Sequence, residues 1–230
     1  MNTKQGARLG PARKRILVVD DHPIFREGLL QSINRQPDLV VCGEAENAQQ
    51  ALNAVRTLKP DLVLVDISIP GKSGFELVKD IQALHPEAPV LVLSMHDESL
   101  YAERVLRAGA RGYIMKQEQP KKLLEAIRQV LGGKTYVSEK IAARILDVFS
   151  GRRPLGGGLP LERLTDREFE VLHLIGSGKN SHEIAKELHL SVKTVDTHRT
   201  HLKEKLKLKS ALQLTRYAVC WSEGSNAPNL

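Results

Sequence analysis

Four short segments of this 230-residue chain are apolar and largely aliphatic, which is typical of strands buried on both faces of a sheet. They span residues 15–19, 61–65, 89–93 and 112–115. The polar residues that end them are, in chain order, Asp20 with Asp21, Asp66, Ser94 and Lys116. Since the carboxyl ends of parallel strands open onto one edge of a sheet, we expect these side chains to converge in one site.

These residue types suit phosphoryl transfer. Three clustered carboxylates repel one another and stay ionised near neutral pH only with a cation between them, and a set of oxygen ligands favours Mg²⁺ over Zn²⁺. With its charge screened, Asp66 is free to attack phosphorus and form an aspartyl phosphate. Lys116 and the Ser94 hydroxyl are suited to holding the incoming phosphoryl oxygens.

A structural interpretation of each acid stays open. Any one of them could simply end a strand or cap the next helix, as Asp21 before Pro23 would. That interpretation explains five suitable residues at four strand ends less readily than a shared site does.

Strand and helix patterns alternate through the first part of the chain. A further strand is predicted over residues 40–43, and helices are predicted over 24–30, 48–58, 75–84, 100–108 and 121–131. Five strands alternating with five helices indicate a doubly wound, flavodoxin-like α/β domain with a five-stranded parallel sheet. We assign this domain to residues 14–133, after a disordered tail of residues 1–13.

The rest of the chain is predicted to be a linker and a small all-α domain. A helix over 139–149 is followed by a stretch, 151–160, rich in Gly and Pro, so residues 134–160 are assigned to a linker helix and a flexible linker. In the domain over 161–222, Thr165 and Glu168 have capping-box spacing. A short helix over 181–188 and a longer one from Ser191 have the pattern of a helix-turn-helix. Residues 223–230 are predicted to be a tail.

Positive charge is concentrated in the carboxyl-terminal part. Residues 1–131 carry 18 Lys and Arg against 16 acids, whereas residues 132–230 carry 16 against 11. Residues 191–209 alone hold six basic residues and two acids. A charged run is often only a solvated face, but this one coincides with the second helix of the predicted helix-turn-helix. Double-stranded DNA is therefore the expected polyanionic partner.

The chain resembles two-component response regulators of the NarL/FixJ type over residues 15–221. The receiver part of the resemblance is carried by VDDHP at 19–23, VDISIPG at 65–71, LSMH at 93–96 and AGARGYIMK at 108–116. The resemblance implies that Asp66 is the phosphoacceptor and that Asp21, Asp66 and the Ser68 backbone carbonyl bind Mg²⁺, with Asp20 acting through water. It also implies that Ser94 and Tyr113 form a switch pair.

A second, independent resemblance is to the LuxR-type helix-turn-helix. It is carried by LTDRE at 164–168, NSHEIA at 180–185 and KTVDTH at 193–198. It implies DNA contacts from Lys193, Thr194, Asp196, Thr197, Arg199, Thr200 and Lys203. Base edges are expected to meet Asp196, Thr197 and Thr200, and phosphates Lys193, Arg199 and Lys203. An apolar stripe on the last helix nominates Leu214, Ala218 and Trp221 for dimerisation.

The sequence thus predicts a phosphorylation-controlled DNA-binding transcriptional regulator. The resemblance implies a sensor histidine kinase as phosphodonor and a homodimer as the active form, with no enzymatic activity beyond the chain's own phosphorylation and dephosphorylation. Two alternatives stay open: a regulator with a vestigial receiver that binds DNA without phosphorylation, and an aspartate-nucleophile phosphatase. An aspartate-nucleophile phosphatase typically needs a second acid two residues after the nucleophile, and this chain has Ser68 at that position.

The sequence contains no run of eighteen apolar residues, and residues 1–13 contain no apolar segment. We therefore expect a cytoplasmic protein without membrane partners.

Overall fold

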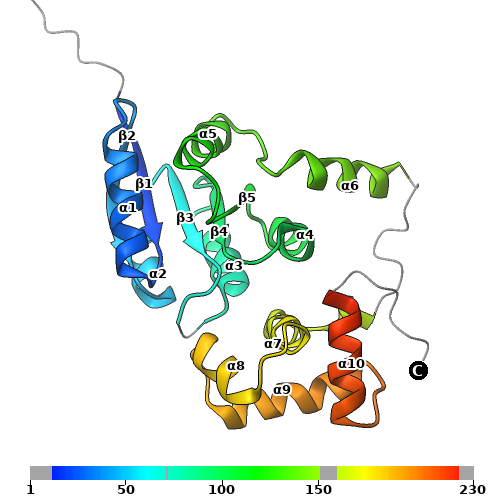
Figure 1. Ribbon diagram of the computed structural model, residues 1–230. Helices are drawn as coiled ribbons and strands as arrows, with labels where there is room; N and C mark the ends of the chain where they lie inside the picture. The colour runs from blue at the N-terminus through cyan, green and yellow to red at the C-terminus, as the bar shows by residue number, and fades with distance from the viewer. Residues whose placement is uncertain (1–11, 71, 151–159, 223–230) are drawn as a thin grey trace, which may run out of the picture.

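The computed structural model describes residues 12–70, 72–150 and 160–222 (Figure 1). The first domain is built on one parallel sheet with strand order β2-β1-β3-β4-β5. Its strands are β1 (Lys14–Val19), β2 (Leu39–Ala45), β3 (Leu62–Asp66), β4 (Val90–Ser94) and β5 (Gly112–Met115). Its helices are α1 (Pro23–Asn34), α2 (Ala48–Leu58), α3 (Gly74–Leu84), α4 (Glu98–Arg107) and α5 (Pro120–Leu131). The predicted doubly wound α/β domain is confirmed.

Successive residues of the strands point to opposite faces, and each face is covered by its own helices. Leu17 and Val19 lie in the apolar core formed with α2, α3 and α4. Ile16 and Val18 lie in the core formed with α1 and α5. Both faces are thus shielded from water, which explains why the strands read as continuous apolar runs. The polar residues at the strand ends are consequently left at the sheet edge.

The second domain is helical. Its elements are η1 (Pro160–Arg163), α7 (Asp166–Gly176), α8 (Ser181–Glu187), α9 (Val192–Lys205) and α10 (Ala211–Ser222). The predicted capping box is present: Glu168 N donates to the Thr165 hydroxyl at 3.3 Å, and Thr165 N donates to the Glu168 carboxylate at 2.7 Å. These contacts satisfy amide groups that the first turn of α7 would otherwise leave unpaired.

The predicted linker helix is α6 (Glu139–Phe149), and it is held against the first domain. Arg144 donates to the Ser99 carbonyl at 3.0 Å, and Ser138 donates to Glu98 at 2.6 Å, so α6 lies beside α4. Residues 151–159 of the predicted flexible linker lie outside the described residues, as do residues 1–11 and 223–230 of the predicted tails. Arg13, assigned to the first tail, donates to the Leu39 carbonyl at 2.7 Å.

The apolar stripe of α10 corrects one assignment made from the sequence. Leu214 and Ala218 are fully buried in the core of the second domain, where α10 packs against α7. Trp221 is half-buried against Phe169 and His173. Leu214 and Ala218, nominated for dimerisation, therefore serve intramolecular packing, whereas the role nominated for the half-buried Trp221 stays a prediction.

The two domains are docked through α7 and α8, and α9 lies on the far side of these helices from the sheet (Figure 1). One apolar core runs from the sheet through α3 and α4 into α7, α9 and α10.

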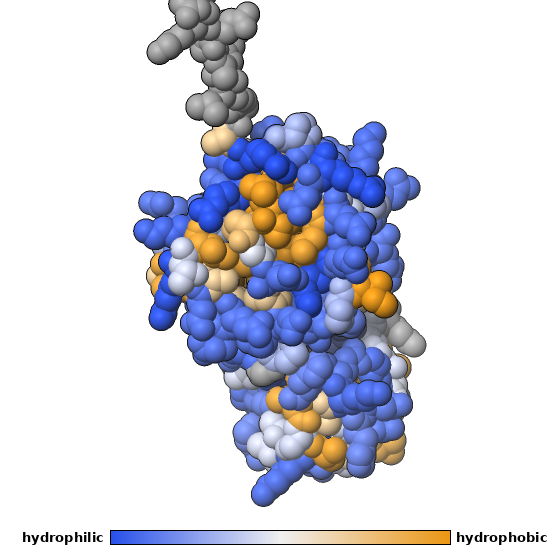
Figure 2. All heavy atoms as spheres, turned by 90° about the vertical axis from the view of Figure 1, so that its left-hand side faces the viewer, coloured by the Kyte–Doolittle hydropathy of each residue, from blue (hydrophilic) through white to orange (hydrophobic). Residues whose placement is uncertain are grey.

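Hydrophobic side chains also gather on one outer face of the first domain, which Figure 2 shows. Ile24 of α1 is an exposed hydrophobic residue, with 89% of its surface accessible. In the described part of the chain, every helix is too short or too polar to cross a membrane.

Candidate functional site

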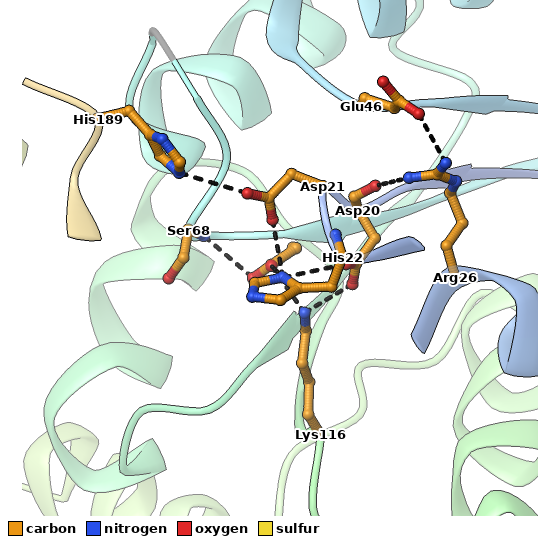
Figure 3. A network of polar contacts seen from close by, with 9 residues as sticks. Asp20, Asp21, His22, Arg26, Glu46, Ser68, Lys116 and His189 are labelled. Carbon is orange, nitrogen blue, oxygen red and sulfur yellow. Dashed lines mark hydrogen bonds and ion pairs between the residues drawn. The ribbon is translucent and has the colours of Figure 1, made fainter. Parts of the chain in front are cut away.

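The predicted acids and lysine meet at the carboxyl end of the sheet (Figure 3). Asp20 follows β1, Asp66 ends β3 and Lys116 follows β5. The Lys116 Nζ lies 2.6 Å from an Asp20 oxygen and 2.7 Å from an Asp66 oxygen. Asp20 and Asp66 are 1% and 2% exposed, so both carboxylates are removed from bulk water. The convergence predicted from the strand ends is observed.

Hydrogen bonds from the chain fix the two buried acids. The His22 amide donates to Asp20 Oδ1 at 2.9 Å, and the Ser68 amide donates to Asp66 Oδ1 at 3.0 Å. Arg26 of α1 donates to the Asp20 carbonyl at 2.7 Å and is itself paired with Glu44 and Glu46 of the β2 end. Arg26 was missed in the sequence; its signal is a charged residue on the buried face of an otherwise amphipathic helix.

The site has the donor set of a cation centre. Asp20, Asp21, His22 and Asp66 each offer a ligand atom, and these atoms lie within 4.8 Å of one another. The Asp21 Oδ1 is buried and accepts no well-aligned hydrogen bond, although His22 Nδ1 is 2.8 Å away. A buried carboxylate oxygen without a donor is costly unless a cation binds it. Three carboxylates and a nearby imidazole therefore fit a divalent ion.

Burial and charge perturb the ionisation of this site. Burial raises the pKa of Asp66; Lys116 opposes this shift, and Asp20 adds to it. Burial lowers the pKa of Lys116, but the adjacent Asp66 and Asp20 more than offset this effect, so the pKa is raised overall. Lys116 also lies 4.6 Å from the centroid of the Phe25 ring. An ammonium group charged at neutral pH thus faces Asp66.

The predicted switch pair is joined through one loop residue. Ser94 is fully buried and its hydroxyl accepts a hydrogen bond from the His96 amide at 3.0 Å. Tyr113 is 1% exposed, and its hydroxyl donates to the His96 carbonyl at 2.8 Å. Movement of the segment that carries His96 would therefore affect both side chains, which the sequence pattern did not indicate.

Aromatic rings continue from this loop into the second domain. The His96 ring stacks on Tyr101 of α4 at 4.6 Å, and Tyr101 meets Phe169 and His173 of α7 edge-on at 5.2 and 5.3 Å. His96 also meets His173 at 5.3 Å. Tyr101 is fully buried and its hydroxyl has no hydrogen-bond partner in the described part of the chain. Ser94 and Tyr113, the predicted switch pair, thus lie one contact away from the domain interface.

Polar contacts surround the ring cluster. Asp166, the first residue of α7, accepts from Lys79 of α3 and Arg104 of α4, each at 2.7 Å. The buried Ser73 hydroxyl donates to the buried Glu170 carboxylate at 2.9 Å. These contacts join residues far apart in sequence, and they orient α7 against the sheet domain.

Protonation of His173 is expected to weaken this docking. Burial lowers the pKa of His173 to about 4, and among the charged groups that face it His96 and Lys179 lower it further while Glu187 and Asp97 raise it. In the undocked domain, His173 would take up this proton near its usual pKa of 6.5. The free energy of docking should therefore be unaffected above pH 7. It should become less favourable by about 1 kcal/mol per pH unit as the pH falls from 6.5 toward 4, because the undocked state binds more protons.

The single tryptophan, Trp221, lies 6.2 Å from His173 and gives a readout. Its emission, together with the radius of gyration, should change over this pH window. In a His173→Gln chain, both titrations should become shallower, and His96, whose pKa burial also lowers to about 4, would account for the remainder. An unchanged titration in that variant would assign the transition to other groups.

The outer face of α9 is free of the first domain. Lys193, Asp196, Thr197 and Thr200 are exposed, and Thr194, Arg199 and Lys203 are half-exposed. The Ser181 hydroxyl of α8 donates to Asp196 at 2.9 Å, so this carboxylate also ties the two helices together. The Thr197 and Thr200 hydroxyls donate to the carbonyls of Lys193 and Asp196. These exposed side chains thus keep acceptor lone pairs and methyl groups for other contacts.

Comparisons with known proteins agree with this architecture. The family described as the response regulator receiver domain matches residues 16–128, and the family of bacterial regulatory proteins of the LuxR type matches residues 162–218. The chain is 39% identical over 209 residues to the oxygen regulatory protein NreC of Staphylococcus aureus, covering 89% of this chain and 96% of that protein.

Two solved structures extend the comparison. A LuxR-family two-component response regulator from Aurantimonas sp. SI85-9A1 is 37% identical with a TM-score of 0.56, covering 60% of this chain and 99% of that one. RcsB from Salmonella enterica serovar Typhimurium, bound to promoter rprA in the presence of the phosphomimetic BeF3−, is 28% identical with a TM-score of 0.60. That match covers 90% of this chain and 99% of RcsB. The chain therefore belongs to the two-component response regulators that join a receiver domain to a LuxR-type helix-turn-helix domain.

Proposed function

We propose that Mg²⁺-dependent phosphorylation of Asp66, with a sensor histidine kinase as the physiological donor, controls DNA binding through α9. The observation that carries the proposal is the Lys116 ammonium group, held 2.7 Å from Asp66 and 2.6 Å from Asp20. The completeness of this site favours a working receiver over a vestigial one.

Asp21, Asp66 and the Ser68 carbonyl would hold Mg²⁺ directly, and Asp20 would act through water. The ion would screen the carboxylates and neutralise charge that develops on the phosphoryl oxygens. Asp66 supplies the attacking oxygen. Lys116 and the buried Ser94 hydroxyl would hold phosphoryl oxygens, and the product would stay on the chain, so no turnover of an external substrate is proposed.

DNA recognition is proposed for the exposed face of α9. RcsB, a relative with the same two domains, is seen bound to promoter DNA. One helix-turn-helix domain covers only a half-site, so two chains would bind half-sites about one helical turn apart. Docking to the receiver fixes the direction of α9 without covering it. We propose that phosphorylation releases this constraint and permits pairing, with a homodimer as the active form.

The direct test is selection of bound DNA from a random pool by the full chain, with and without Mg²⁺ and acetyl phosphate. Phosphorylated protein should select two similar half-sites and sediment as a dimer on that DNA. Selection of the same sequences with the same affinity by both forms would refute phosphorylation control, even with Asp66 labelled.

Lys203 is expected to contact phosphates rather than bases. Lys203→Ala should weaken binding to all DNA sequences similarly and reduce the slope of log K against log salt by about 1, because one fewer counterion is released. Lys121→Ala, an exposed lysine on α5 far from α9, is the matched control and should keep the slope. An unchanged slope in Lys203→Ala would remove Lys203 from the phosphate contacts.

A further inference from the structure

An acid stands among the exposed residues of α9. Lys193, Asp196, Thr197 and Thr200 are all exposed and are spaced as i, i+3, i+4 and i+7, so they form one stripe along the helix. This exposed stripe lies toward the amino-terminal end of α9, the part of a recognition helix whose side chains reach base edges in the major groove. Because phosphates repel a carboxylate, Asp196 needs a hydrogen-bond donor on the DNA to be compatible with binding.

The Asp196 carboxylate is held by a hydroxyl group and not by a neighbouring cation. The Ser181 hydroxyl of α8 donates to Asp196 Oδ1 at 2.9 Å. Lys193 and Arg199 lie three residues away on either side, yet Asp196 makes no ion pair with any described residue. One carboxylate oxygen is therefore fixed, and within the described chain the other has no donor.

The Ser181 hydroxyl is presented by a well-capped helix start. Ser181 is the first residue of α8, and the Asn180 side chain before it accepts from the His182 amide at 2.9 Å. On α9, Val195 beside Asp196 is fully buried in the core of the domain. Both partners of the hydrogen bond thus belong to packed elements, so the carboxylate loses little conformational freedom when it binds DNA.

We propose that Asp196 reads a cytosine in each half-site, accepting a hydrogen bond from the N4 amino group with its free oxygen, and that Ser181 is a positioning residue for this contact. The inference rests on the DNA recognition by α9 proposed above. In the major groove, cytosine presents a donor, whereas guanine presents acceptors and thymine presents an acceptor and a methyl group. Adenine also has an amino group, but its N7 acceptor lies beside it and repels a carboxylate.

An amide at the same position should read a different base. Asp196→Asn keeps an oxygen that can accept from Ser181, and it adds an amino group that can donate to adenine N7 while the oxygen accepts from adenine N6. This variant should therefore exchange cytosine for adenine at one base pair and leave the rest of the site unchanged. Loss of the negative charge alone would strengthen binding to every sequence alike.

The test is selection of bound DNA from a random pool by the phosphorylated full chain, followed by titration of sites that differ at single base pairs. The wild-type protein should prefer cytosine at one position of each half-site by about five- to tenfold. Asp196→Asn should prefer adenine there, and Asp196→Ala should have no preference there. Glu204→Gln, which changes another exposed acid of α9, is the matched control and should keep the cytosine.

Two variants of Ser181 test its positioning role. Ser181→Ala should reduce the preference for cytosine about two- to fivefold without installing another base, because the carboxylate must then be ordered on binding. Ser181→Thr keeps the hydroxyl and should restore the preference. Equal weakening of all sites by Ser181→Ala would show that the hydrogen bond only stabilises the fold and would overturn the positioning role.

The base preference decides the inference about Asp196. A cytosine kept by both Asp196→Asn and Asp196→Ala overturns it, as does the absence of any base pair at which these variants and the wild type differ. A wild-type chain that selects no common sequence would instead fail the proposed function itself.

Discussion

Asp66→Asn is expected to abolish phosphoryl uptake from acetyl phosphate. The amide oxygen of Asn is a poor nucleophile, and the neutral side chain also removes one of the charges that would hold Mg²⁺. The measurement is incorporation of labelled phosphoryl groups per chain in Mg²⁺, which should approach one in the wild-type protein. Mg²⁺ removal by a chelator should have the same effect in the wild-type chain.

Two further variants make this test specific. Asp61→Asn is the matched control, because Asp61 lies just before β3, at the opposite end of that strand from Asp66, and pairs with Lys14 at 3.0 Å. It should be labelled normally. Lys116→Ala should slow labelling by about 10²- to 10³-fold, the loss typical of one group that stabilises developing charge. Equal labelling of the wild type and Asp66→Asn would show that another residue accepts the phosphoryl group.

The sequence predicts well those features that depend on neighbouring residues. Strands buried on both faces need continuous apolar runs, so their ends, and with them Asp66 and Lys116, could be located. The start of α7 follows from the local chemistry of Thr165 and Glu168. The helix predicted over 139–149 agrees with α6 because its amphipathic pattern and the following Gly and Pro residues are also local signals.

The sequence does not show which surfaces meet. Periodicity indicates that Leu214 and Ala218 share an apolar stripe, but only the tertiary structure shows that α7 covers it. Likewise Ser73 and Glu170 are 97 residues apart, and neither stands in a motif that predicts their hydrogen bond. His96 was visible within a receiver motif, yet its ring is held by contacts with both domains.

Charge reversal at Asp166 is expected to separate the domains. The Asp166 side chain is 11% exposed and lies between Lys79 and Arg104, whose side chains are 55% and 22% exposed. Burial raises the pKa of Asp166, but the two hydrogen-bonded cations more than offset this and lower it. Asp166→Arg would place three cations together. Docking should weaken by about 2–4 kcal/mol, a value below that of a fully buried pair because Lys79 is partly solvated.

The radius of gyration of the full chain and the emission of Trp221 report this change. Glu118→Arg, which breaks an exposed ion pair with Lys122, is the control and should leave both unchanged. Arg104→Glu combined with Asp166→Arg should restore compactness only in part: the pair is re-formed with reversed sign, but the contacts of Arg104 with the Leu164 carbonyl and the Phe169 ring are lost. In the undocked variant, phosphorylation should alter DNA affinity less than in the wild-type chain. A compact Asp166→Arg chain would show that the other contacts between the domains, among them the aromatic cluster and the Ser73–Glu170 hydrogen bond, are enough to hold them together.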